Sequence, residues 1–117
     1  MAEQKAKRVW KIRTVKGYPE AHSHLLIGEV IDVTAAYVRI KCQTYHFGRS
    51  TGTVKDIRVG ENGVRIVPWN RIELVNELPP DFHYARAGLS AEPGGDIVLT
   101  DEGYKCVIVR LFDSRKI

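Results

Sequence analysis

The sequence LLIGEVIDVTAAYVRIKCQTYHF, residues 25–47, indicates a β fold, because it reads as two long strands joined by a short turn. Apolar and polar residues alternate through 37–47, and a period of two is typical of a strand with one buried face. The predicted core face comprises Val38, Ile40, Cys42, Thr44 and His46. The opposite face, which runs from Tyr37 to Tyr45, is predicted to be exposed.

Strand patterns continue on both sides of this pair, and no amphipathic stripe with helix caps interrupts them. They cover residues 8–16, 53–59, 64–67, 71–78, 96–101 and 104–112. The sequence GENG (60–63) predicts a hairpin turn. Gly28 lies inside a strand, where glycine often marks a bulge or sharp bend. The sequence therefore predicts a mostly β fold, and the short strands favour a small bent barrel over a sandwich.

A chain of 117 residues is one domain of ordinary size. We expect a basic N-terminal arm over 1–8 and a barrel over 9–78. A Pro/Gly-rich segment, 79–95, predicts a long loop, and 96–117 predicts a C-terminal β-hairpin packed on the same domain.

Positive charge is concentrated at the N-terminus. The net charge is +4, yet residues 1–16 hold six lysines and arginines against one glutamate, so the remainder is close to neutral. A one-sided basic segment is typical of a protein that binds an acidic partner such as RNA. The alternative is a terminus that only aids solubility. Nothing in the sequence approaches the roughly 20 apolar residues of a membrane helix, so no membrane partner is expected.

Three motifs occur in an informative order: Lys16-Gly17 at a strand end, GEVIDV (28–33), and VRIVPWNRIELV (64–75) as two short strands around a corner. In this order residues 8–76 resemble the Sm-like (LSm) small β-barrel superfamily, which is related to SH3-like barrels. The resemblance implies a five-stranded bent barrel, a homo-oligomer formed through edge strands, and RNA binding.

The RNA-contact motifs of that superfamily are not retained here. Asp32 is present, but the loop VTAAY (33–37) lacks the asparagine that follows in the family. The segment from Val67 to Asn70 replaces the family's turn before the last strand. The resemblance therefore supports the fold more than the activity.

The predicted function is a non-enzymatic module that binds RNA or another single-stranded nucleic acid as an oligomer. Phosphate attraction is assigned to Lys5, Lys7, Arg8, Lys11 and Arg13, and base contacts to Arg49, Trp69, Asn70 and Arg71. Trp10 and Ile12 are expected to face the core. Two alternatives remain: Trp69 and Phe47 plug the barrel ends, or the aromatic corners form a protein–protein assembly surface without a nucleic-acid role.

No other motif predicts chemistry. His22 and His24 share a strand face, but a metal would need a third ligand from His46, His83 or a cysteine, so no metal site is predicted. The sequence lacks a P-loop, a G-x-S-x-G elbow and a dinucleotide fingerprint, so neither an enzyme nor a cofactor is expected. Cys42 and Cys106 fit free core thiols of a cytoplasmic protein, which we expect because the N-terminus lacks an apolar export signal.

Overall fold

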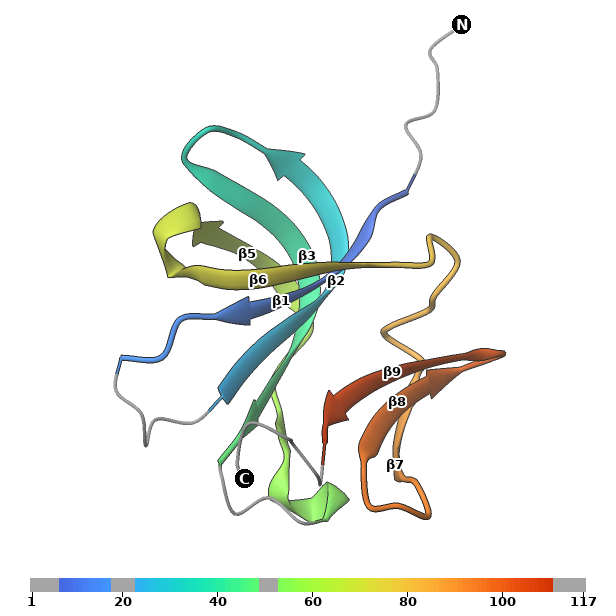
Figure 1. Cartoon of the computed structure of the whole chain (residues 1–117). Helices are drawn as coiled ribbons and strands as arrows, with labels where there is room; N and C mark the ends of the chain where they lie inside the picture. Colours follow the sequence, from blue (N-terminus) through green and yellow to red (C-terminus); the bar gives the residue numbers. More distant parts are fainter. Residues whose placement is uncertain (1–6, 18–22, 49–52, 111–117) are drawn as a thin grey trace, which may run out of the picture.

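The computed structural model describes residues 7–17, 23–48 and 53–110, and these residues form two antiparallel β-sheets without an α-helix (Figure 1). The strands are β1 (Val9–Thr14), β2 (Ser23–Val33), β3 (Tyr37–Phe47), β4 (Arg58–Val59), β5 (Gly63–Pro68), β6 (Ile72–Leu78), β7 (Gly88–Ala91), β8 (Ile97–Asp101) and β9 (Tyr104–Val109). Two 3₁₀ helices, η1 (Val54–Asp56) and η2 (Trp69–Arg71), complete the elements. The predicted mostly β fold class is confirmed.

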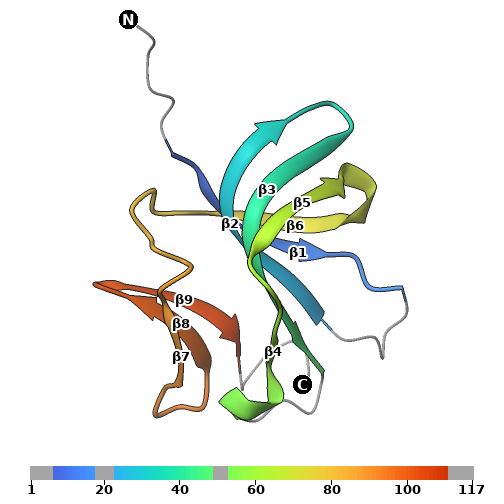
Figure 2. The same cartoon turned by 180° about the vertical axis from the view of Figure 1, so that it is seen from behind.

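The main sheet has the order β4-β3-β2-β1-β6, and β5 also pairs with β3. Figure 2 shows β4 and β5 following one another along the same edge of β3. The predicted hairpin at 60–63 is therefore wrong. The amide of Gly60 instead donates to the carbonyl of Thr44 at 2.9 Å and continues the ladder. A Cβ at residue 60 would lie 2.1 Å from the Thr44 hydroxyl, so this glycine is needed for close approach and not for a turn.

The main sheet must curl strongly, because its two edge strands are joined by only three residues. In a flat sheet β5 and β6 would lie four strand spacings, or about 19 Å, apart. The chain from Pro68 to Ile72 can span at most about 14 Å. The edges do not pair with each other among the described residues, so the sheet curls without closing into a barrel.

The concave face of the curled sheet holds the first of two cores. This concave core draws on the central strands and on β5, and consists of Ile12, Leu26, Val30, Val38, Ile40, Cys42 and Val67. Trp10 packs against it from β1, as the alternation of that strand predicts. The edge strand β6 adds Ile72 and Val75.

The opposite face of the main sheet packs against the small sheet formed by β7, β8 and β9 (Figure 1). This junction core joins the two sheets and includes Val9, Leu25, Ile27, Tyr45, Phe47, Leu78, Phe82, Ile97, Leu99, Cys106 and Ile108. The prediction that Tyr45 is exposed is wrong, because Tyr45 is buried in this core. Val9, on the face of β1 opposite Trp10 and Ile12, is also buried. Alternation within a strand cannot show that a second sheet covers the polar-looking face.

Gly28 does not mark a bulge, because its register with Trp10 and Cys42 is regular and the bulge of β2 lies between Val30 and Asp32. A Cβ on Gly28 would lie 2.0 Å from the carbonyl oxygen of Lys41. The glycine is therefore required by the close approach of β3 to β2.

The small sheet begins inside the segment that was expected to be one long loop. The predicted hairpin of β8 and β9 is present, and Gly103 turns it with a φ of +92°. Strand β7 was not predicted, since GLSA (88–91) has little apolar pattern and is held by pairing with β8. No helix among the described residues is long and apolar enough to cross a membrane.

Candidate nucleic-acid interface

The predicted basic residues that the structure describes in the N-terminal segment do not form one surface. Lys5 and Arg49 lie outside the described residues. Lys7 and Arg8 are exposed before β1, but the Arg8 carbonyl accepts a 2.8 Å bond from the amide of Val30. The Arg8 guanidinium carbon also lies 5.7 Å from the centre of the Trp10 ring, in cation–π range. Arg8 is therefore part of the sheet rather than of a free arm.

Lys11 and Arg13 both lie on the face of β1 that meets the small sheet. The Lys11 ammonium group donates to the carbonyl of Val107 on β9 at 3.1 Å, so it links the two sheets. Arg13 is half-buried between Leu25 and Leu74, and its Nε has no hydrogen-bond partner among the described residues. The Lys11 ammonium group is therefore engaged within the fold, and the Arg13 side chain is half-buried.

Trp69, Asn70 and Arg71 make up η2, and all three are exposed. The indole nitrogen of Trp69 donates to the carbonyl of Thr34 at 2.8 Å. The backbone amide of Trp69 donates to the carbonyl of Ala36 at 3.2 Å. These bonds tie η2 to the tip of the β2–β3 hairpin. Trp69 stays 37% exposed, whereas Phe47 is buried in the junction core. Phe47 is thus buried between the two sheets and does not plug a barrel end.

A second tie joins η2 to the end of β1. The amide of Val15 donates to the carbonyl of Arg71 at 2.7 Å, which brings the next residue, exposed Lys16, to the same end of the sheet. We call Lys16, Trp69, Asn70 and Arg71 the η2 surface. Lys16 was counted in the N-terminal charge but not predicted as a contact; its place at a strand end beside a polar turn was the available signal.

The η2 surface and the start of β1 lie at opposite ends of the main sheet (Figure 1). β1 ends beside η2, where Thr14 pairs with Ile72, and begins beside the last residue of β6, where Val9 pairs with Leu78. The predicted base-contact corner is therefore a full strand length away from Lys7 and Arg8.

Two histidines stack on the concave side of the sheet. His24 and His46 are cross-strand partners with ring centres 4.0 Å apart and planes inclined by 10°. Burial, and then the charges of His46 and Arg65, lower the pKa of His24 to about 4. His22 lies outside the described residues, and among those described no three His, Cys, Asp or Glu side chains cluster closely enough to hold a metal.

Lowering the pH from 7 to 4.5 should destabilise the fold by roughly 2 kcal/mol through His24, after allowance for its partial exposure. The unfolded chain takes up this proton near pH 6.5, but the folded chain does so only near pH 4. Stability from His24 is therefore complete above pH 6.5 and declines down to about pH 4. Urea unfolding at several pH values measures this loss of stability in the wild type and in His24→Phe. The variant keeps a ring against His46. An identical pH dependence in the two proteins would contradict the assignment.

The two cysteines are free and buried, and neither is an activated nucleophile. Burial raises the pKa of Cys42 to about 11, against a smaller opposing effect of Arg65. Burial also raises the pKa of Cys106, which Lys11 partly offsets. Both thiols therefore stay protonated near neutral pH, and a reactive thiolate would need the opposite shift.

The chain was compared with protein-family models, curated proteins and solved structures. No protein-family model matches the chain, and searches of curated proteins and of solved structures gave no match either. The chemistry of the η2 surface must therefore be judged from its own residues.

Proposed function

We propose that the chain is a non-enzymatic module that binds RNA or another single-stranded nucleic acid through the η2 surface. The observation that carries this proposal is the exposed Trp69-Asn70-Arg71 triplet, held by hydrogen bonds to Thr34, Ala36 and Val15. A partly exposed indole offers a face on which a base can stack, and an amide can bond a base edge. Arg71 and Lys16 supply positive charge for the phosphates.

Preorganisation strengthens this proposal. The three hydrogen bonds hold η2 from both sides, so its side chains lose less conformational freedom on binding than those of a loose loop. Lys7 and Arg8, at the far end of β1, lie too far away to share the contact with η2. They add long-range attraction for a polyanion. A nucleic-acid strand long enough to reach both ends of β1 would be attracted by Lys7 and Arg8 as well as by the η2 surface.

We infer in addition that the main sheet is an open, partly closed barrel of the SH3-like or Sm-like type, and that the chain assembles into a homo-oligomer. Its strong curl around the concave core and the short η2 connection support the barrel. The edge strands β5 and β6 support assembly, because each pairs on one side only among the described residues. Ile66 on β5 is 60% exposed, and Leu74 on β6 is 48% exposed.

The same exposed edges favour a second candidate function, a protein–protein assembly module without a nucleic-acid role. A row of exposed apolar side chains on an edge strand, here Val64 and Ile66 on β5, is a common docking surface for another chain. The two candidates differ in their salt response. Phosphate binding weakens steeply as salt rises, whereas apolar edge pairing does not.

The double variant Lys16→Ala/Arg71→Ala should lose about tenfold or more of its affinity for single-stranded RNA at about 50 mM salt, because two phosphate contacts disappear. Fluorescence anisotropy with a labelled oligonucleotide measures this affinity. Trp69→Ala should also weaken binding, but with an unchanged salt dependence, because base stacking is not a charge interaction.

The matched control is Lys55→Ala/Arg86→Ala, which removes the same charge from exposed residues outside the η2 surface. It should bind within about twofold of the wild type. An equal loss in both double variants would show attraction to net charge without a site. Absence of any RNA or DNA binding at low salt would eliminate the nucleic-acid proposal, and light scattering on the same samples would then test the assembly module.

A further inference from the structure

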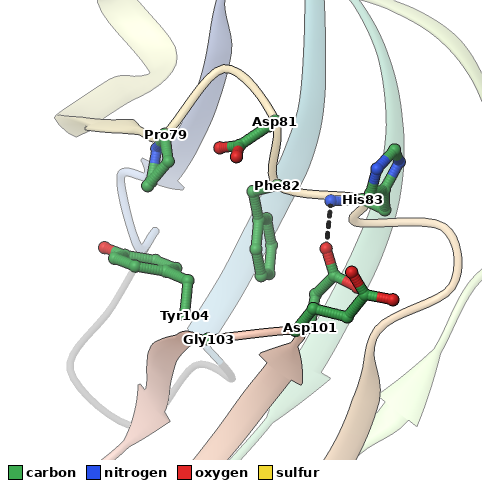
Figure 3. Close-up of a pocket in the computed structure, with 8 residues that line it drawn as sticks. Pro79, Asp81, Phe82, His83, Asp101, Gly103 and Tyr104 are labelled. Atoms are coloured by element: carbon green, nitrogen blue, oxygen red, sulfur yellow. Dashed lines mark hydrogen bonds between the residues drawn. The ribbon is translucent and has the colours of Figure 1, made fainter.

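A cavity of about 300 Å³ lies between the connection that follows β6 and the turn between β8 and β9 (Figure 3). It is at the opposite end of β6 from η2, so it is separate from the proposed nucleic-acid surface. Its lining includes the aromatic rings of Phe82 and Tyr104 and the carboxylates of Asp81, Asp101 and Glu102.

Both walls of the cavity are fixed by contacts within the described chain. Phe82 is buried in the junction core and anchors the connection, and its amide donates to the carbonyl of Pro79 at 3.0 Å. The amide of His83 donates to Asp101 Oδ2 at 2.8 Å and ties the connection to the β8–β9 hairpin. The cavity is therefore largely preformed, which lowers the entropic cost of filling it.

The aromatic wall offers a surface for a cation. The rings of Tyr104 and Phe82 meet edge to face with centres 5.5 Å apart, and Tyr104 remains partly exposed toward solvent. Figure 3 shows Asp81 above these rings and Asp101 on the far side of Phe82. A cation placed against the π-face of an aromatic ring is attracted by its quadrupole, and nearby carboxylates strengthen this attraction.

The charge of the cavity is opposite to that of the whole chain. Its lining contains three carboxylates and no lysine or arginine, with His83 as the one basic side chain, although the chain carries a net charge of +4. An anionic ligand is therefore disfavoured, and a cationic one is attracted to this end of the molecule.

We propose that this cavity binds an organic cation of the ammonium or guanidinium type, such as the head group of a lysine or arginine side chain. A bare metal ion is a poor fit, because no group of three acidic, histidine or cysteine side chains among the described residues could hold one. The volume lies at the small end of ligand pockets, which suits a single side chain or a small amine and not a nucleotide or large cofactor.

Titration with N-acetyl-arginine amide, followed by the backbone NMR shifts of the full chain, tests the proposal. We expect saturable shifts in 79–83 and 101–104. The neutral isostere N-acetyl-citrulline amide should bind at least about tenfold more weakly, because it lacks the charge. The same titration with N-acetyl-lysine amide and with spermidine shows whether the cavity prefers a cationic side chain or a free polyamine. Equal shifts from citrulline, or no saturable shift from any cation, would overturn the proposal.

Two variants assign the binding to this cavity. Asp81→Asn/Glu102→Gln changes exposed carboxylates that make no described structural bond, and it should weaken arginine-amide binding about fivefold to tenfold. The control Glu61→Gln/Glu73→Gln removes the same charge from exposed residues outside the cavity and should leave binding within about twofold. Tyr104→Leu keeps an apolar wall without the ring and should also weaken binding. If the control weakens binding as much as the cavity variant does, the shifts report net charge alone and the site is refuted.

Discussion

Replacing Gly28 with alanine should destabilise the protein by about 3 kcal/mol or more, the largest effect expected of any single methyl group here. A Cβ at residue 28 would lie 2.0 Å from the Lys41 carbonyl oxygen and 2.5 Å from the Cys42 Cα. These are backbone atoms of the neighbouring strand, so no side-chain rotation relieves the clash. β2 and β3 would have to separate at the centre of the main sheet, where their ladder hydrogen bonds are shielded by both cores.

Gly63→Ala is a closely matched control for this prediction. Gly28 and Gly63 both pair with Cys42, the first from β2 and the second from β5. A Cβ on Gly63 would meet nothing within 4 Å, and its φ is not positive. We therefore expect Gly63→Ala to remain within about 1 kcal/mol of the wild type. Urea unfolding measures both variants, and equal losses of stability would contradict the close-approach explanation for Gly28.

Replacing Leu99 with alanine should cost about 2–5 kcal/mol and should destabilise both sheets together. Leu99 is 1% exposed on the central strand of the small sheet and belongs to the junction core with Leu25 and Ile27. Truncation leaves a cavity at the contact between the sheets, and the main sheet loses the cover of its second face. One cooperative unfolding transition is therefore expected, at lower denaturant, with both sheets unfolding in it.

Leu74→Ala serves as the control, because Leu74 carries the same side chain on edge strand β6 but is 48% exposed. Its truncation should cost under about 1 kcal/mol. Circular dichroism follows both sheets, whereas the fluorescence of Trp10 and Trp69 follows the main sheet. Recorded along one urea gradient, the two signals should change together. If Leu99→Ala produced two separate transitions, the small sheet would be an independent unit and the junction core would not couple it to the main sheet.

Much of the local structure could be predicted from particular residues. The alternation of 37–44 indicates the buried face of β3, and the pairing of β8 with β9 agrees with the pattern and turn read from the sequence. Burial of both cysteines agrees with their place in strand patterns. These features depend on near neighbours in the chain, and the alternation of apolar and polar residues along a strand indicates them directly.

The candidate site was predictable only in part. Trp69, Asn70 and Arg71 were recognised by their residue types, and the structure exposes them. Lys11 was assigned to phosphate because a lysine in an alternating strand looks solvated, yet its ammonium group bonds to Val107. That bond spans most of the chain, so no local pattern around Lys11 could indicate it.

The sequence alone indicates most of the strands, though not β7, and it shows which residue types are available for binding, because alternation and charge are properties of neighbouring residues. The burial of β2 and β3 on both faces at one end becomes visible only in the folded protein. The close approach of β3 at Gly28 is likewise a tertiary contact, and so is the bond from Val15 that places η2 beside Lys16 and far from Lys7 and Arg8. Each of these features depends on contacts between strands and sheets that are distant in the sequence, and such contacts form only when the whole chain folds.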